Sequence, residues 1–562
     1  MKNQYILGSL VVLGMALTSC DDFLNDNRFP MSQQTVNQEF WSNSVNVQNQ
    51  INYFYEDFSG YGNGTGSGDF YYKTLNDDQC GRREFTNWTN TNVPSTSTYW
   101  NNPYIEIRRA FSVIDGIANS GLLEDEKTNF TAIAKLHIAR NYFLLVKRYG
   151  DVPLVKKALD PADEAELFGE RVSRNEVMDY VLQCLDEAIA GIAKQSSKTE
   201  FSRDMAQAVK AEICLFEGSY AKYHKQDNAR ATKFFQESVK AGEAIAASYP
   251  IGADYTALYK SFRAEMDANA EVIFAKMYEK DVFMHSIIDY SSASDGIAGL
   301  TRDAFDSYLF LDGKPKASTT LDNTDKGVPE GTTALSIDNL LNVRDKRLSM
   351  TTYDHVFFPG MTWTGPNTAA MYSRTGYGVS KYDNFSIPES DATTANKGYN
   401  CAPLFWGARL YLAIAEAKAE LGTLTDADVN KYLNPLFQRA GLPDVTVASM
   451  TAMADPANNM GVSSLLWEIR RCRRCELIMD DDIRYWDLVR WHQLELLDTE
   501  KHPASIQGAY VVNAPIACND MLGDYCDASY GVSRKFSDRE YFWPIPSGQI
   551  QLNKKLTQNP GW

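Results

Sequence analysis

The sequence predicts an all-α protein, in which tetratricopeptide-like helix pairs carry long, irregular ligand-binding loops. Two observations support this fold class. Apolar residues recur every three or four positions in several long segments, as they do on one face of an α-helix. Aromatic residues (31 Tyr, 27 Phe and 10 Trp) are abundant, and many lie in two further segments rich in Gly, Ser, Thr and Asn.

The chain begins with a predicted signal peptide, residues 1–19. After Lys2, residues 6–17 form an uncharged, mostly apolar core that is too short to cross a bilayer as a helix. Leu17-Thr18-Ser19 then precede Cys20, a pattern that resembles the lipobox of bacterial lipoproteins. Cys20 is therefore the predicted lipid anchor, because several acyl chains attach a protein durably to a membrane. The alternative is an ordinary secreted protein in which Cys20 has no such role.

Residues 20–35 are polar and irregular, and we interpret them as a lipidated tether. The remainder, 36–562, is predicted to be one domain in three parts. These are an N-terminal helical part at about 36–250, a loop-rich ligand-binding insertion at about 250–400, and a C-terminal helical part at about 401–562.

Two helix pairs stand out in this domain. The first pairs residues 174–193 with 203–223, and the second pairs 404–421 with 427–440. Each pair is joined by a short polar turn, and small residues on the apolar faces allow close packing, which is typical of tetratricopeptide-like units. Because the insertion separates the two pairs, an uninterrupted tandem array is not expected.

The charge and the scattered histidines exclude several classes of function. The formal net charge is −17 and no basic stripe is present, so a nucleic-acid partner is not expected. The six histidines show no metal-binding spacing, and no nucleophile motif appears. We therefore predict no metal, no cofactor and no catalytic residue. The acidic run 480–482 adjoins Arg473, Arg474 and Arg484, which predicts a solvated ion-pair cluster.

Four cysteines have suggestive spacing. Cys518 and Cys526 flank a short loop and are the best candidates for a disulfide. Cys472 and Cys475 have the spacing of a redox motif, but they lie inside a charged predicted helix with no strand before it. Redox chemistry is therefore not predicted for them.

Short motifs follow one another along nearly the whole chain. They are CDDFL (20–24), FW (40–41), WNNPYIEI (100–107), ARNYFLLVKRYGDVPLV (139–155), QRAGLP (438–443), EIRRCRRCEL (468–477), RYWDLVRW (484–491), YFWPIP (541–546) and QNPGW (558–562). In this order they resemble the SusD/RagB family of outer-membrane glycan-binding lipoproteins. Two features depart from the family pattern: the cysteines at 472 and 475, and the unmatched stretch 283–400.

The resemblance implies a non-catalytic protein on four tetratricopeptide-like units. It implies a partner, a SusC-like TonB-dependent outer-membrane transporter, on which the lipoprotein sits as a lid. Asp21 and Asp22 look like the acidic signal that sends such lipoproteins to the outer surface. The expected location is the cell outer membrane, with the lipid-anchored protein facing the exterior.

Sugars present apolar C–H faces and polar edges, so aromatic rings flanked by polar side chains suit them. Trp88 is the first candidate, because related proteins use this loop for stacking aromatics. The further candidate ligand-binding residues are Tyr71, Tyr72, Arg83, Asn90, Tyr290, Trp363 and Tyr372. For each aromatic residue the alternative is an ordinary packed loop side chain.

The leading hypothesis is a surface protein that binds oligosaccharides or polysaccharide and delivers them to the transporter. Three alternatives remain open: a surface glycoside hydrolase using two carboxylates, a SusD-like binder of a non-sugar nutrient such as peptide, and a scaffold for other proteins. The 72 acidic residues do not discriminate, since a carboxylate pair can always be found among them. The sugar, its linkage and the number of sites are not predicted.

Overall fold

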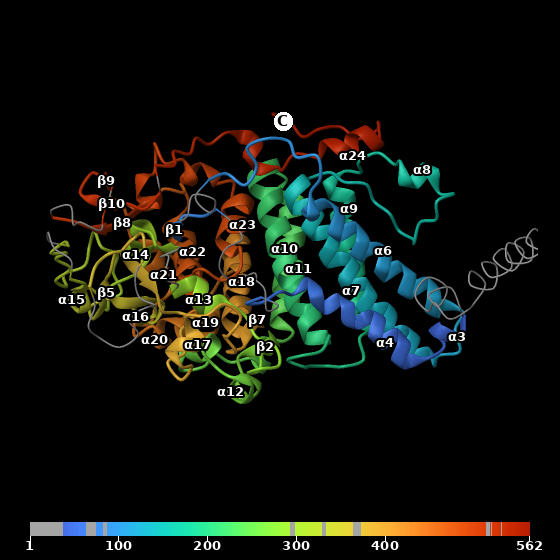
Figure 1. Ribbon diagram of the computed structural model, residues 1–562, viewed down its shortest axis with the longest axis horizontal. Coiled ribbons are helices and arrows are strands. Elements are labelled where there is room, and N and C mark those ends of the chain that lie inside the picture. The colour runs from blue at the N-terminus through green and yellow to red at the C-terminus, as the bar shows by residue number, and fades with distance from the viewer. Residues whose placement is uncertain are drawn as a thin grey trace, which may run out of the picture.

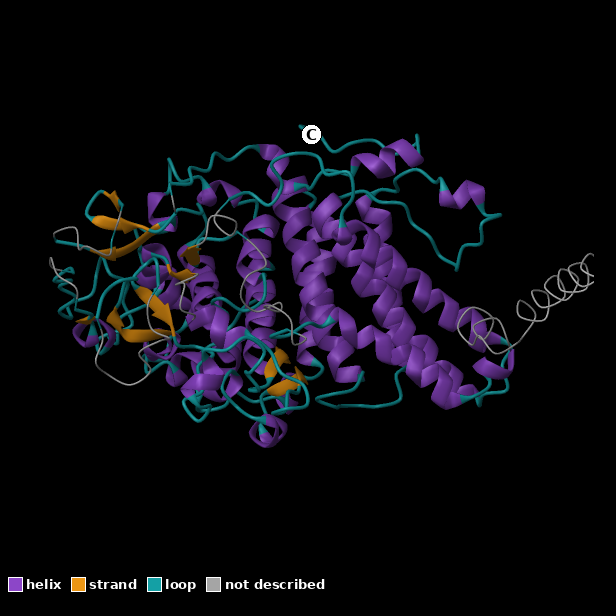
Figure 2. Ribbon diagram, viewed as in Figure 1, coloured by secondary structure: helices purple, strands orange, loops and turns teal. Residues whose placement is uncertain are grey.

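The structure, a computed structural model, describes residues 38–62, 75–81, 87–292, 298–328, 333–362, 373–512, 518, 520–529 and 531–562. Helices dominate and the strands are short (Figure 2), which confirms the all-α prediction. Long helices packed side by side form one half of the molecule, and short helices, strands and loops form the other (Figure 1).

The long helices form an array, in which each packs against the next along the chain except the first, which packs against the third. The array consists of α4 (Ser44–Asn52), α6 (Thr98–Ala118), α7 (Glu124–Tyr149), α9 (Arg174–Gly191), α10 (Arg203–Lys225) and α11 (Asn228–Glu243). The predicted first pair is confirmed as α9 and α10. Hydroxyl caps start both helices, because Ser173 Oγ accepts from the amide of Glu176 and Ser202 Oγ from that of Met205.

Helix α18 (Gly407–Glu420) extends the array although the insertion separates it in sequence from α11. It packs against both α10 and α11. At Gly242 of α11 a Cβ atom would lie 2.5 Å from Ile414 Cγ1, so the missing side chain allows this close approach. The helices therefore stack continuously in space, which the interrupted sequence pattern does not indicate.

The second predicted pair differs at both ends. Residues 404–406 of its first member belong to β7 (Ala402–Trp406), and α18 starts at Gly407. Strand β7 pairs antiparallel with β2 (Val272–Lys276). Its second member is two short helices, α19 (Asp426–Tyr432) and α20 (Asn434–Arg439). The break falls just before Pro435, which lacks an amide hydrogen and is tolerated only in the first turn of a helix.

Residues 250–400 form short elements. The helices are α12 (Arg263–Ala268), α13 (Ile287–Ser292), α14 (Arg302–Ser307), α15 (Asp338–Leu341), α16 (Lys346–Thr351) and α17 (Glu389–Ala392). The remaining strands are β1 (Gln79–Gly81), β3 (Ala298–Leu300), β4 (Leu335–Ser336), β5 (Thr352–Val356), β6 (Tyr377–Val379), β8 (Gln507–Tyr510), β9 (Met521–Leu522) and β10 (Tyr525–Asp527). They pair as β1-β3, β4-β5-β6 and β8-β10-β9.

The remaining helices include α3 (Gln38–Trp41), α8 (Glu164–Leu167), α21 (Val447–Ala452), α22 (Ser464–Glu476), α23 (Ile483–Arg490) and α24 (Ser547–Leu552). The chain ends against the array: the side-chain amide of Asn559 donates to the carbonyls of Tyr149 (3.1 Å) and Trp543 (2.7 Å). The Trp562 indole N–H donates to the carbonyl of Phe542 at 2.8 Å. Hydrogen bonds from the C-terminal motif therefore attach the end of the chain to the C-terminal end of α7.

A buried ion network joins α18, α22 and α23. Both carboxylate oxygens of Glu416 accept from Arg490, at 2.7 and 2.6 Å, and one also accepts from the Trp491 indole at 2.6 Å. Asp487 accepts from Arg473 at 2.7 Å and from Arg490 at 2.8 Å. Burial by itself raises the pKa of Glu416, but the Arg490 guanidinium outweighs it, so that pKa lies below its usual range.

The prediction of a solvated cluster at residues 480–482 is wrong. Asp480 is buried, with its oxygens 2.6 Å from Lys381 Nζ and 2.6 Å from the Tyr259 hydroxyl. Arg473 binds Asp487 instead of the acidic run. The adjacent arginines reach carboxylates that are distant in sequence, and no local pattern could reveal that choice.

The eight cysteines that the structure describes are free thiols. Cys518 and Cys526, the disulfide candidates, are not bonded to each other in the structure, although their thiols interact. Cys472 and Cys475 are buried on α22, and burial raises the pKa of each, to about 11 and about 12. Such thiols are poor nucleophiles, which agrees with the interpretation that they are not a redox pair.

Among the helices of the described part, none combines the length and the apolar character needed to cross a membrane.

Glu416→Met should destabilise the protein strongly, because it removes the carboxylate that accepts two hydrogen bonds from the buried Arg490. Asp487, which also binds Arg473, then remains as the carboxylate partner of Arg490 in the described part. The expected loss is about 3–5 kcal/mol in the free energy of unfolding, measured by urea denaturation at pH 7. Glu187→Met is the matched control, since Glu187 forms an exposed ion pair with Lys135 at 3.1 Å. Its loss should stay below about 1 kcal/mol. Equal losses in the two variants would contradict the role given to Glu416.

Candidate functional site

The described ends of the predicted binding loops meet at one cluster of strands. β1 pairs with β3, with Cys80 opposite Gly299, and β3 lies against β6. β8 joins the cluster where the amide of Ala509 donates to the carbonyl of Thr375 at 2.7 Å. In sequence, these strands flank the segments 63–74, 82–86, 293–297, 363–372 and 513–517. The candidates in those segments are Tyr71, Tyr72, Arg83, Trp363 and Tyr372, which lie outside the described residues.

Two glycines make this strand cluster possible. A Cβ atom at Gly299 of β3 would lie 2.5 Å from the carbonyl oxygen of Tyr377, at the start of β6. A Cβ atom at Gly508 of β8 would lie 2.6 Å from Thr375 Cα. Real Cβ atoms do not approach so closely, so three segments far apart in sequence touch here through their backbones. The strand cluster (β1, β3, β6 and β8) is thus a common base for the loops.

An aspartate pair fastens β1 to the rest of the molecule. Asp77 accepts two hydrogen bonds from Arg484, at 2.7 and 2.6 Å, and Asp78 accepts one from Arg474 at 2.7 Å. The Thr301 hydroxyl donates to the Asp77 carbonyl at 2.6 Å, which ties β3 to the same point. Burial raises the pKa of Asp77, but Arg474 and Arg484 outweigh it and hold this pKa below its usual range.

Sequence reasoning missed these two aspartates. The available signal was the arginine-rich helix at 468–477, which itself holds four arginines and two glutamates. Those cations require acidic partners from elsewhere in the chain once the helix is buried. Nothing local identifies Asp77 and Asp78 as the partners.

Trp88, the first ligand candidate, is half-buried. Its indole N–H donates to the carbonyl of Lys535 at 3.0 Å, and its ring packs beside the buried cluster that contains Leu75. Tyr290 on α13 is also half-buried and packs against the main core, and Asn90 is half-buried. Packing therefore covers part of the Trp88 ring and part of the Tyr290 ring. Ligand binding by Trp88, Tyr290 and Asn90 stays a prediction.

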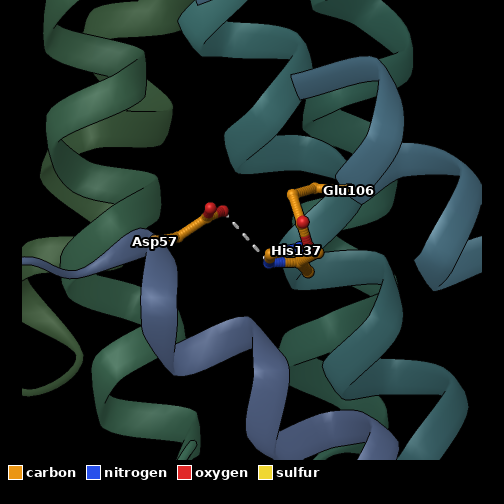
Figure 3. A group of neighbouring side chains, drawn as sticks. All are labelled: Asp57, Glu106 and His137. Atoms are coloured by element: carbon orange, nitrogen blue, oxygen red, sulfur yellow. Dashed lines mark hydrogen bonds and ion pairs between the residues drawn. The ribbon is translucent and has the colours of Figure 1, made fainter. Parts of the chain in front are cut away.

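One cluster has the ligand types of a metal site: Asp57, Glu106 and His137 (Figure 3). One ligand atom from each lies within 4.8 Å of the others. The buried His137 stands between the carboxylates, with Nδ1 3.4 Å from Asp57 Oδ2 and Nε2 3.2 Å from Glu106 Oε2. It comes from α7, Glu106 comes from α6, and Asp57 ends the 3₁₀ helix η1 (Tyr53–Asp57).

The neighbours of this cluster favour an ion-pair network instead. Arg109 Nη1 lies 2.6 Å from Glu106, and Arg140 Nη1 lies 3.2 Å from Asp57. Two guanidinium groups already balance the two carboxylates, so a divalent cation would add uncompensated positive charge in a poorly solvated place. The two imidazole nitrogens also face different carboxylates. We therefore interpret the cluster as a tie between η1, α6 and α7.

Two family models match the chain. One is described as the SusD family and matches residues 270–562. The other is described as starch-binding and associating with the outer membrane, and it matches residues 22–215. A search of curated proteins found no match.

Solved structures share the fold over nearly the whole chain. A SusD-like carbohydrate-binding protein from Bacteroides fragilis has a TM-score of 0.68 at 22% identity, covering 92% of this chain and 100% of its own. A laminarin-binding SusD-like protein has a TM-score of 0.56 at 18% identity, with 93% and 100% covered. Surface glycan-binding protein A from Bacteroides fluxus has a TM-score of 0.58 at 16% identity, again with 93% and 100% covered.

Gly299→Ala should disturb the strand cluster without unfolding the protein. The added methyl group collides with the backbone of β6, and overpacking of this kind costs about 1–3 kcal/mol. We expect that loss in urea denaturation, together with weaker ligand binding. Gly121→Ala is the control, because its Cβ would meet only Ser42 Oγ at 3.4 Å. If Gly299→Ala is as stable as the control, the close approach of β3 and β6 is not a constraint.

Proposed function

This chain belongs to the SusD family, and on that premise we propose that it is a non-catalytic, lipid-anchored receptor for glycans at the outer membrane. It binds oligosaccharide or polysaccharide by aromatic stacking and passes it to a SusC-like TonB-dependent transporter. The family match and the shared fold support the first part of this proposal. Two proteins of similar fold, one described as laminarin-binding and the other as glycan-binding, agree with it.

The single observation that carries the proposal is the convergence of the loop ends on the strand cluster. Five segments from widely separated parts of the sequence start or finish there, and they contain five of the eight ligand candidates. A rigid base of paired strands and buried ion pairs suits a binding site, since a preorganised site loses less entropy when its ligand binds.

The composition of these segments fits sugar recognition. Aromatic rings stack on the apolar faces of sugar rings, while Arg and Asn side chains donate to the hydroxyl groups at their edges. Trp88, Tyr71 and Tyr72 supply the first kind of contact in our proposal, and Arg83 and Asn90 supply the second. Tyr290, Trp363 and Tyr372 are the further stacking candidates of the proposed site.

In this proposal, the lipid tether keeps the receptor on the same membrane as the transporter. An acylated Cys20 keeps the protein on the membrane surface, where a transporter also resides. Confinement raises the effective concentration of the two proteins for each other without any new contact. Delivery to a transporter therefore needs only a weak interface, which suits a lid that opens and closes.

Trp88→Ala should weaken retention of the protein in a native gel that contains its cognate polysaccharide. The expected loss of affinity is about tenfold or more, because Trp88 is the first stacking residue in this proposal. Tyr53→Ala is the control, since Tyr53 is an exposed aromatic residue (42% accessible) on the helical array. If a broad panel of polysaccharides fails to retard the protein lacking residues 1–20, the glycan assignment is wrong. Release of reducing sugar by the purified protein would instead support the hydrolase alternative.

Cys20→Ala should release the protein from the membrane. The substitution removes the thiol that carries the acyl chains in this proposal, and with them the attachment to the membrane. We expect the full-length protein in the membrane fraction and the variant in the soluble fraction after cell disruption. Membrane retention of the variant to the same extent would exclude Cys20 as the anchor.

A further inference from the structure

A charged cavity of about 420 Å³ lies between the helical array and the loop-rich half of the molecule. Helices α6, α7 and α10 form one wall. The end of β7, the start of α18 and residues 481–482 form the other. Its volume falls in the range of about 300–1,000 Å³ that small-molecule sites occupy. None of the residues that line it belongs to the strand cluster, so it is distinct from the proposed loop site.

One face of α7 points three cations at this cavity: Arg140, Lys147 and Arg148. These residues are seven and eight positions apart and therefore lie on the same side of the helix. Two of the three have acidic partners, because Arg140 pairs with Asp57 at 3.2 Å and Arg148 with Asp482 at 3.8 Å.

Arg409, the fourth cation of the lining, comes from α18 on the opposite wall. It binds Glu212 of α10 with two nitrogens of its guanidinium group. Arg409 is therefore also satisfied, and the same pair ties the two walls of the cavity together.

Lys147 is different. Its ammonium group makes no hydrogen bond and no ion pair with any residue of the described part, and it is held over the Trp486 ring at 4.4 Å. Loss of solvent lowers the pKa of Lys147 to about 8, even though Asp482 and Asp481 favour its charged form. The side chain is thus still mostly charged at neutral pH. Lys147 lines the cavity, and the described residues offer no acceptor for its three N–H donors, so its hydrogen-bonding capacity is unmet there.

The charge of the lining selects the class of ligand. The four cations are matched by four carboxylates: Asp57, Glu212, Asp481 and Asp482. A ligand with a net charge would unbalance a poorly solvated site, and that is costly. A neutral molecule with many hydroxyl groups keeps the balance, accepts from Lys147 and donates to carboxylate oxygens. Sugars have this chemistry.

Tyr99 adds an aromatic surface to the same cavity. Its side chain is 37% accessible, and it lines the same cavity as Lys147. The Arg148 guanidinium lies 4.7 Å from the centre of its ring, and Trp543 packs edge-on at 4.9 Å. These contacts fix the orientation of Tyr99, so the cavity lining combines an aromatic ring with the Lys147 ammonium group.

We propose that this cavity is a second saccharide-binding site, in which Lys147 donates to the hydroxyl groups of one neutral sugar and Tyr99 packs against its ring. The site needs neither the strand cluster nor the loops attached to it. It shares only the class of ligand with the proposed function, and its own lining defines that class. A sugar at the end of a glycan chain would bind there between the helical array and the loop-rich half.

The test is saturation-transfer NMR on the protein lacking residues 1–20, with glucose, galactose, mannose, xylose and acetate as separate probes. We expect transfer to at least one sugar, with a loss of fivefold or more in affinity on Lys147→Met or Tyr99→Ala. Lys127→Met is the matched control, because Lys127 lies on the same helix but binds Glu124 at 2.9 Å outside the cavity. Thermal melts of each variant check that it is folded.

Absence of transfer to all four sugars, or transfer that Lys147→Met and Tyr99→Ala leave unchanged, overturns the proposal. Transfer to acetate alone, lost with Lys147→Met, would define an anion site and also overturn it. The Trp88→Ala variant separates this inference from the proposed function. If Trp88→Ala abolishes polysaccharide retention while the cavity variants change nothing, only the second site fails. If the cavity variants lose sugar binding while Trp88→Ala has no effect, only the loop site fails.

Discussion

The structure depends on the burial of the arginines of α22 and α23 against carboxylates from distant elements. Arg490 meets Glu416 of α18, Arg473 meets Asp487, and Arg474 meets Asp78 beside β1. Each buried guanidinium group needs its partner, because a lone charge inside a protein costs several kcal/mol. The arginines therefore determine which segments may lie next to α22. They couple the helical array, the C-terminal helices and the strand cluster into one body.

This coupling explains how long loops can carry a binding function. A loop by itself loses much conformational entropy when it holds a ligand. Here the loop ends are attached to strands that glycines bring into backbone contact, and Arg474 and Arg484 fasten those strands to the core through Asp77 and Asp78. The proposed recognition surface therefore stands on strands that close backbone contacts and buried ion pairs hold in place.

Sequence reasoning predicted the helical class, the pair α9–α10 and the structural character of Cys472 and Cys475. It predicted the second helix pair less well, because residues 402–406 are committed to β7 by a partner strand 130 positions away. It also misjudged the acidic run, since Asp480 finds Lys381 and Tyr259 instead of the adjacent arginines. For the candidate site, it selected loop residues by composition and missed Asp77 and Asp78, whose roles arise only from distant partners.

Local and compositional properties were therefore accessible from the sequence alone. Helical periodicity, the predicted signal peptide with Cys20, the aromatic-rich segments and the family motifs all depend on neighbouring residues. The tertiary structure decided which elements pack together: α18 stacks on α11 across the insertion, and the loop ends share one base. It also placed Lys147 in a cavity where the described residues offer its ammonium group no hydrogen-bond acceptor. Such pairings depend on burial and on long-range charge balance, and short stretches of sequence do not encode either.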